Sequence, residues 1–245
     1  IILISPSDKA DAQMRIFNAD GSEGKMCGNG IRCVGKYLYD NGMTDGRTTI
    51  TIDTLSGVKT LELTVKDGKM QSARVDMGAA ILAPREIPVD MDGENVISAP
   101  IVVDEKVYHM TCVSMGNPHC VIFQKEDVDD LDLTRIGPKF EHHPLFPERV
   151  NTEFVNVLPD GSLKMRVWER GSGETMACGT GACATAVAAI LNGCAEREVT
   201  VHLLGGDLEI QWDETDNCVY MTGAAATAFT GEFDPEELRA SVEDR

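Results

Sequence analysis

Polar and apolar positions alternate along most of the chain, in short runs separated by turn residues. A period of two residues is typical of strands with one buried face, and Ser, Gly, Asp and Pro between runs are typical of turns. The chain starts inside such an apolar run, Ile1-Ile2-Leu3-Ile4. The runs that predict further strands cover residues 13–18, 48–54, 58–65, 70–77, 107–113, 120–123, 152–158, 163–168, 198–203, 206–212 and 218–221.

Two segments, residues 28–40 and 179–191, have helical character, and each is followed by Asn-Gly, a common end of a helix. The second is rich in alanine and apolar nearly all round, which predicts a buried helix. A short helix is predicted to start at Asp234-Pro235. Residues 79–100 show no clear period and are predicted to cross between two halves. The first helix is predicted to present Ile31, Val34, Tyr37 and Leu38 on one side.

One short motif occurs twice, each time at the start of a predicted helix. The copies are Cys27-Gly28-Asn29-Gly30 and Cys178-Gly179-Thr180-Gly181, and each follows a stretch containing Gly and Ser. Their offset, 178 minus 27, is 151 residues, far longer than a solenoid repeat. The sequence therefore predicts a duplicated α+β architecture with two halves, each a sheet wrapped on one helix.

The repeated cysteines stand where a helix exposes unpaired N–H groups and the positive end of its dipole. That position favours a thiolate over a thiol and binds anions. We therefore expect lowered pKa values for Cys27 and Cys178, so that a thiolate can act as a base near neutral pH. The other cysteines are predicted to be small apolar core residues: Cys33, Cys112, Cys120, Cys183, Cys194 and Cys218.

Composition narrows the classes of function. The 245 residues carry 22 Lys and Arg against 40 Asp and Glu, a net charge of −18, so we expect neither nucleic-acid nor membrane binding, both of which need a basic face. No apolar run reaches the length of a membrane span. The eight cysteines include no Cys-x-x-Cys pair, and we expect reduced thiols in a cytoplasmic protein. The five histidines show no metal-site spacing.

Five motifs in order resemble those of the diaminopimelate epimerase family, and the resemblance covers nearly the whole chain. The motifs are Asn18-Ala19-Asp20-Gly21-Ser22-Glu23 with Met26-Cys27-Gly28-Asn29-Gly30, Gly116-Asn117-Pro118-His119, Arg149-Val150-Asn151, Glu169-Arg170-Gly171-Ser172-Gly173-Glu174-Thr175, and Ala177-Cys178-Gly179-Thr180-Gly181. The resemblance implies two pseudo-twofold-related halves, each with a curved, mostly antiparallel sheet around a central helix. Residues 1–77 plus 224–245 would form the first half and residues 78–223 the second.

The resemblance also implies a reaction: interconversion of LL- and meso-diaminopimelate, without pyridoxal phosphate or metal, in lysine and cell-wall precursor biosynthesis. Inversion needs a base on one face of the α-carbon and an acid on the other, which Cys27 and Cys178 would supply. We expect no cofactor, and we expect a homodimer.

By the same resemblance, the remaining motif residues contact the substrate. Backbone N–H groups of Gly28, Asn29, Gly179 and Thr180 would hold the reacting carboxylate. Glu169 would take an ammonium group, and His119 would lie near the cysteines. The distal carboxylate would be held by Asn18, Asn117, Asn151 and Arg170.

Two alternatives remain open. Proline racemase-type enzymes share the implied fold and both cysteines, but usually have His where this chain has Asn29. Family members normally begin with a strand carrying Gly-Asn-Asp-Phe, whose Asn contacts substrate, and a later Gln does likewise. Both would precede Ile1, so we expect the natural chain to begin earlier, and the second alternative is an inactive amino-acid-binding fragment.

Overall fold

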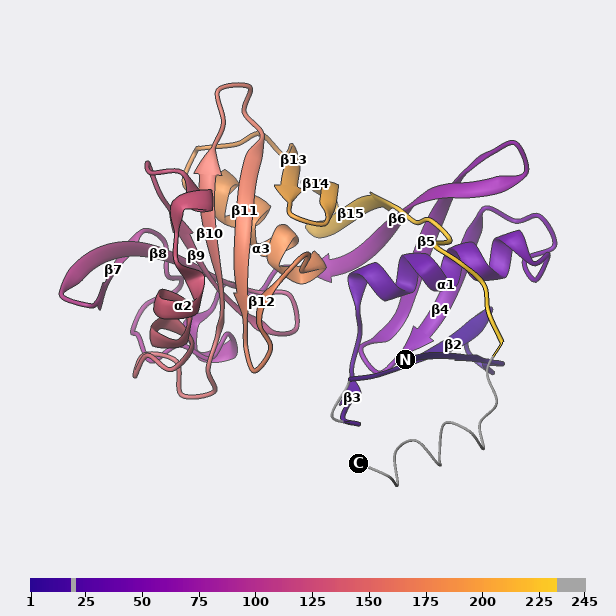
Figure 1. Cartoon of the computed structure of the whole chain (residues 1–245), viewed down its shortest axis with the longest axis horizontal. Helices are drawn as coiled ribbons and strands as arrows, with labels where there is room; N and C mark the ends of the chain where they lie inside the picture. The colour runs from indigo at the N-terminus through magenta and orange to yellow at the C-terminus, as the bar shows by residue number, and fades with distance from the viewer. Residues whose placement is uncertain (19–20, 233–245) are drawn as a thin grey trace.

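The computed structural model describes residues 1–18 and 21–232, and Figure 1 shows how the chain divides into two lobes joined by a few long strands. The first part of the chain forms one helix and six strands. These are β1 (Ile2–Ser5), β2 (Ala12–Phe17), β3 (Glu23–Gly24), α1 (Gly28–Asp40), β4 (Thr49–Thr54), β5 (Gly57–Lys66) and β6 (Lys69–Ala79).

The second part is larger. Its first segments are η1 (Pro84–Glu86), β7 (Ala99–Val103), β8 (Lys106–Ser114), β9 (Pro118–Phe123), η2 (Val128–Asp130) and α2 (Leu133–Glu141). Its later segments are β10 (Asn151–Val157), β11 (Leu163–Glu169), β12 (Gly173–Thr175), α3 (Gly179–Leu191), β13 (Glu198–Leu203), β14 (Gly206–Trp212) and β15 (Cys218–Ala224). No helix in the described part of the chain combines the length and hydropathy that a membrane crossing requires.

The strand order shows the duplication directly. One continuous sheet runs β1-β2-β4-β5-β6-β15-β14-β13-β11-β10-β9-β8-β7. Within it β2 pairs parallel with β4, and β11 pairs parallel with β13. The segment β10 to β15 with α3 thus repeats the pairing of β1 to β6 with α1, and the equivalent strands β6 and β15 pair antiparallel at the centre. The predicted α+β fold class is confirmed.

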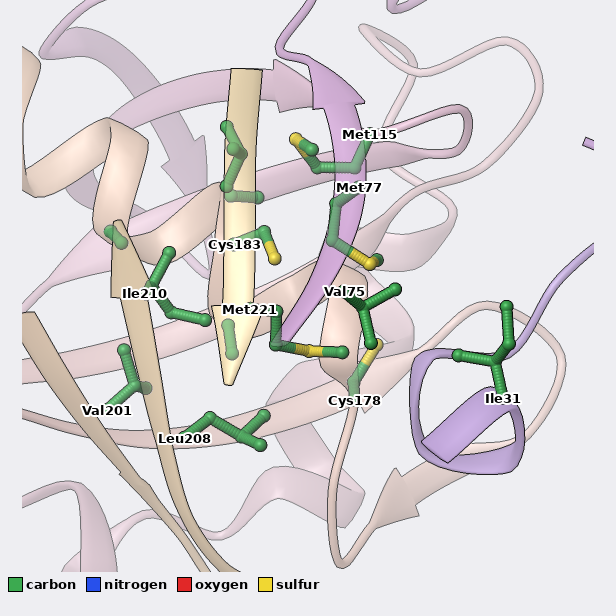
Figure 2. Close-up of a cluster of buried hydrophobic side chains, with 14 of the residues drawn as sticks. Ile31, Val75, Met77, Met115, Cys178, Cys183, Val201, Leu208, Ile210 and Met221 are labelled. Carbon is green, nitrogen blue, oxygen red and sulfur yellow. The ribbon is translucent and has the colours of Figure 1, made fainter. Parts of the chain in front are cut away.

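The main hydrophobic core is shared by the two halves. It includes residues of α1, α3 and both central strands, and Figure 2 shows Ile31, Val75, Cys178 and Met221 within it. The predicted burial of α3 is confirmed, because its residues from Ala182 to Ala189 are all buried. Small side chains let surrounding strands approach this helix closely, so α3 is fixed on nearly every side.

Helix α2 was not predicted, and the reason is local. It contains Gly137 and Pro138, two residues that usually break helices. Asp132 caps its N-terminus by accepting the Arg135 N–H at 3.2 Å. Phe140 then packs edge-on against Phe154, with ring centroids 5.4 Å apart, in a second, smaller core.

Several burial predictions are wrong. Tyr37 is 49% exposed, so the buried side of α1 is narrower than predicted. Cys33 and Cys194 are exposed and Cys218 is half-buried, because they lie on the outer side of α1, in the turn after α3 and at the start of β15. The helix predicted at residues 234–235 lies outside the described residues.

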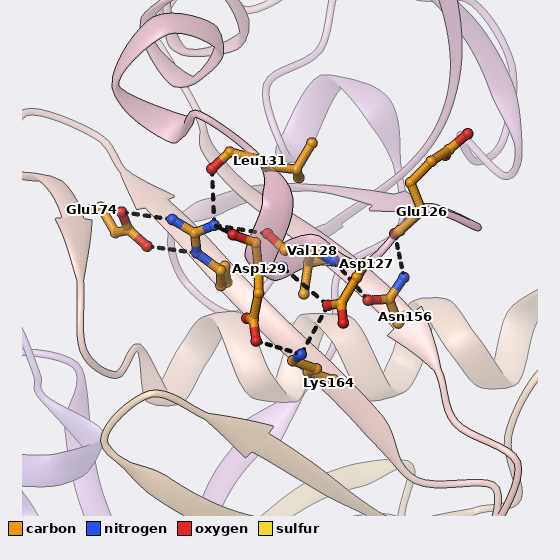
Figure 3. A network of polar contacts seen from close by, with 9 residues as sticks. Glu126, Asp127, Val128, Asp129, Leu131, Asn156, Lys164 and Glu174 are labelled. Carbon is orange, nitrogen blue, oxygen red and sulfur yellow. Dashed lines mark hydrogen bonds and ion pairs between the residues drawn. The ribbon is translucent and has the colours of Figure 1, made fainter.

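A polar network fixes the strands that lead into α3 (Figure 3). Arg166 on β11 donates to three backbone carbonyls of the η2 segment, at 2.7 to 3.2 Å, and pairs with Glu174 on β12 at 2.8 Å. Lys164 and Asn156 bind the same segment from β11 and β10. The path from β11 through β12 toward Cys178 is thereby tied to the rest of the second half.

Candidate active site

The N-termini of α1 and α3 meet at the junction of the two halves. A Cβ added to Gly179 would lie 3.4 Å from the Cα of Gly28, and one added to Gly28 would lie 2.8 Å from the Met221 methyl. Larger residues would push the helix ends apart, which explains glycine at both positions. The pairing of β6 with β15 thus brings together two motifs that are 151 residues apart in the sequence.

Cys27 and Cys178 occupy equivalent positions as the N-caps of these helices. The Gly30 N–H donates to the Cys27 Sγ at 3.3 Å, and the Gly181 N–H donates to the Cys178 Sγ at 3.4 Å. Each sulfur therefore takes one of the N–H groups that a helix start leaves unpaired. The prediction that both cysteines lie at helix N-termini is confirmed.

The two thiols differ in their surroundings. Cys27 is half-buried, whereas Cys178 is only 6% exposed. Burial, followed by the nearby carboxylates of Glu169 and Glu153, raises the pKa of the Cys178 thiol well above its ordinary value, and bonds from Thr180 and Gly181 offset little of this. The prediction of a lowered pKa is therefore wrong for Cys178, because desolvation outweighs the helix terminus.

We expect Cys178 to react with iodoacetamide only slowly at neutral pH, with a rate that keeps rising above pH 9, because the thiolate is the reactive form. Peptide mass spectrometry of the pH series measures this, with the exposed Cys33 and Cys194 as internal references. A Cys178 rate that levels off below pH 8 would contradict the raised pKa.

Three predicted substrate-binding residues lie at the helix ends. The Asn29 amide donates to the carbonyl of Ala177 at 3.4 Å, across the junction. The Asn117 amide, from the bend just before β9, donates to the Thr180 hydroxyl at 3.2 Å. The structure thus places Asn29 and Thr180 at the two helix starts and Asn117 beside Thr180, while their roles in substrate binding stay predictions.

Arg32 is a site residue that the sequence analysis missed. It is 7% exposed, donates to the Gly28 carbonyl at 3.0 Å and to the Asn29 side-chain oxygen at 3.1 Å, and reaches β15 through the Ala224 carbonyl. Among the described residues, no carboxylate lies within ion-pair distance of its guanidinium. Its position four residues after Gly28, one turn along the same helix, was the available signal.

The segment Glu169-Arg170 is held by its neighbours. Asn151 accepts the Arg170 N–H at 2.9 Å and donates to the Pro118 carbonyl at 2.8 Å. The Glu169 carboxylate accepts from the Thr175 hydroxyl, and the Arg170 guanidinium donates to the Glu148 carbonyl at 3.0 Å. Asn151 therefore acts here by fixing the backbone of Arg170 against β9.

The last two predicted site residues lie in contrasting places. His119 is fully buried on β9, where its ring bonds to Glu153 and Asn117. Asn18 is exposed in the loop after β2, and its amide donates to the Ser22 hydroxyl at 3.0 Å. Among residues 1–18 and 21–232, no group of three His, Cys, Asp or Glu side chains is placed to hold a metal ion.

Comparison with solved structures defines the class of fold. A hydroxyproline epimerase from Agrobacterium vitis matches with a TM-score of 0.69 at 17% identity, over 92% of this chain and 72% of that one. This chain therefore shares the fold of that hydroxyproline epimerase.

The chain belongs to the diaminopimelate epimerase family, whose model matches residues 1–83 and 111–228. A diaminopimelate epimerase from Acetivibrio thermocellus is 58% identical over 97% of this chain and 84% of its own length. One from Desulfovibrio desulfuricans is 56% identical over 95% of this chain and 83% of its own length.

Proposed function

We propose that this chain interconverts LL- and meso-diaminopimelate by moving the α-proton between two thiols, Cys27 and Cys178. The observation that carries the proposal is the meeting of two cysteine-capped helix N-termini, one from each repeated half. Family membership and the 54–58% identity to named diaminopimelate epimerases support this substrate over the proline-type alternative.

Inversion at carbon requires groups on two opposite faces, since a base that removes a proton from one face cannot return it to the other. One thiol must be ionised and the other protonated in each direction of the reaction. The high pKa of Cys178 favours an unliganded state in which Cys178 is the thiol.

The reacting carboxylate would bind between the helix ends, where charge builds up as the α-proton leaves. Backbone N–H groups of Gly28, Asn29, Gly179 and Thr180 would stabilise it. Arg32 adds a buried positive charge at the same junction, which suits an anionic ligand.

Residues near β9, β11 and the loop after β2 would bind the distal end of the substrate. Arg170 would bind the distal carboxylate with Asn18 and Asn117, while Asn151 holds the Arg170 backbone in place. Glu169 would take an ammonium group.

We also propose a division into halves, a cellular location and an oligomeric state. The functional halves would be residues 1–77 plus 224–245 and residues 78–223, with the site between them. The protein would act in the cytoplasm, where its thiols stay reduced. It would form a homodimer, which sedimentation can test directly.

Proton NMR of LL-diaminopimelate in D2O with the reduced protein tests the activity. We expect the α-proton signal to fall as the meso isomer appears carrying deuterium. Binding of the amino acid without any α-proton exchange would instead support a binding module and overturn the proposal.

A further inference from the structure

A fully buried acid–base pair lies beneath the start of α3. The His119 Nδ1 and the Glu153 Oε1 are 2.7 Å apart, and both side chains are 0% exposed. In the parallel pairing of β9 with β10, His119 is opposite Asn151 and Val121 is opposite Glu153, so the two side chains project from the same sheet face. That face is the one covered by α3.

Three of the sheet positions beside this pair are valines. Val121 and Val155 are 0% exposed and Val167, opposite Glu153 on β11, is 1% exposed. The second Glu153 oxygen, Oε2, has no hydrogen-bond partner among the described residues. Burial of such a group is costly, so its presence in a valine-lined layer calls for a functional explanation.

Glu153 also lies directly against the second cysteine motif. A Cβ added to Gly181 would be 2.7 Å from the Glu153 Oε1, and Gly181 is the residue whose N–H binds the Cys178 sulfur. The glycine of the motif therefore makes room for this carboxylate as well as for the helix start.

A chain of hydrogen bonds leads from Glu153 to the thiol. The His119 Nε2 is 3.1 Å from the Asn117 Oδ1, the Asn117 Nδ2 is 3.2 Å from the Thr180 Oγ1, and the Thr180 Oγ1 is 3.5 Å from the Cys178 Sγ. Its members come from β10, β9 and α3, and Glu169 on β11 is the other carboxylate whose charge acts on Cys178.

The chain has a direction. An amide oxygen only accepts, so the His119 Nε2 carries a proton and donates to Asn117. The Asn117 amide then donates to Thr180, which leaves the Thr180 hydroxyl hydrogen free to point at sulfur. Between Nδ1 and Glu153 one further proton is shared, which a carboxylate can accept or return.

We propose that Glu153 is a positioning residue for the proton transfer: by sharing one proton with the Nδ1 of His119, it keeps the other proton on Nε2 and so directs the hydrogen-bond chain toward Cys178. The inference rests on the proposed function, in which Cys178 must become a thiolate in one direction of turnover. A donor aimed at sulfur stabilises that thiolate in a site where burial opposes it.

Glu153→Gln tests this because it keeps the shape and cannot hold the shared proton. His119 can then carry its single proton on Nδ1, Asn117 turns its amide, and the Thr180 hydroxyl donates to Asn117 in place of sulfur. The substitution leaves the net charge of the pair unchanged, because a carboxylate and an imidazole that share one proton are neutral together wherever that proton lies.

We expect kcat to fall roughly tenfold, the scale of one hydrogen bond to a charged group, with KM nearly unchanged. The acid limb of the kcat/KM profile should move to higher pH in the direction for which Cys178 is the base, because its thiolate has lost a donor. Thr152→Val is the matched control, since it removes from the neighbouring position on β10 a buried hydroxyl that has no hydrogen-bond partner within residues 1–18 and 21–232.

A double-mutant cycle distinguishes an effect that passes along the hydrogen-bond chain from Glu153 to Cys178, here called the relay, from a local packing effect of the substitution. Thr180→Val removes the last link while keeping the backbone N–H, so adding Glu153→Gln to it should change kcat by less than about twofold. If the two substitutions lowered kcat independently, so that their effects multiplied in the double variant, the relay would be overturned. It would also be overturned if the acid limb of the Glu153→Gln kcat/KM profile stayed fixed or moved to lower pH.

The wild type and Cys178→Ala belong in the same series, and thermal melts confirm that each variant is folded. The relay alone would be refuted if the wild type turned over, Cys178→Ala did not, and Glu153→Gln had the wild-type kcat and pH profile. No wild-type turnover would refute the proposed function, and the relay with it.

Discussion

Replacing either Cys27 or Cys178 by alanine should lower the interconversion of LL- and meso-diaminopimelate by at least about a thousandfold, within the range of acid–base catalysis. Each variant keeps one helix start and one thiol, but the α-carbon then lacks a proton donor or acceptor on one face. Both cysteines occupy equivalent N-cap positions, so neither substitution is predicted to be milder than the other.

Exchange measurements in D2O make this prediction sharper. Each single variant should still exchange the α-proton of one isomer without inverting it, since its remaining thiol can remove and return a proton on one face. The two variants should therefore select opposite isomers, which also assigns each cysteine to an isomer. Cys194→Ala, at an exposed thiol after α3, is the control that should turn over normally. Inversion retained by either N-cap variant would refute the two-thiol mechanism.

Local signals in the sequence were enough to predict the elements that carry the site. The helices span Gly28–Asp40 and Gly179–Leu191 as predicted, because a capping residue starts each one and Asn-Gly ends it. The repeat of the cysteine motif also predicted the duplicated architecture. Of the candidate residues, Cys27 and Cys178 are those whose place in the fold, at a helix N-terminus, the sequence motif predicted.

Long-range contacts account for what could not be predicted. No local pattern shows that β6 pairs with β15, yet this pairing brings Gly28 to Gly179. The pKa of Cys178 depends on burial and on Glu169 and Glu153, which approach it only in the folded chain. The predicted position of Cys178 at a helix N-terminus was therefore not sufficient to predict the direction of its pKa shift.

Arg32 and Glu153 were missed for a related reason. Each reads in the sequence as an ordinary charged residue of a helix or strand, of the kind that is usually exposed. Both are buried, Arg32 at 7% and Glu153 at 0% exposure, and a buried charge needs hydrogen-bond or opposite-charge partners. Their burial is the observation that makes them candidates for a role in the site. Only the fold shows that both side chains point to the junction of the helix starts.

Gly137→Ala should be among the most destabilising single substitutions in the chain, although alanine is the better helix former by about 1 kcal/mol. Its Cβ would overlap the indole ring of Trp168, which crosses α2 at this point. The ring cannot move aside easily, because its N–H donates to the buried Glu141 carboxylate at 2.8 Å. We expect a loss of about 3 kcal/mol in the free energy of unfolding, and a melting temperature lower by roughly 5–10 °C.

Gly35→Ala on α1 is the matched control, since it also replaces a glycine inside a helix. Its Cβ would meet the terminal methyl groups of Leu61 at 2.9 Å, Leu63 at 3.3 Å and Ile50 at 3.9 Å, which can shift more easily than an indole ring, so stability should change by less than about 1 kcal/mol. Thermal unfolding followed by circular dichroism compares the two variants. Because Trp168 directly precedes Glu169-Arg170, Gly137→Ala should also raise KM at temperatures where the protein remains folded. Equal stability of the two variants would show that the indole ring moves aside without cost, and would contradict the prediction.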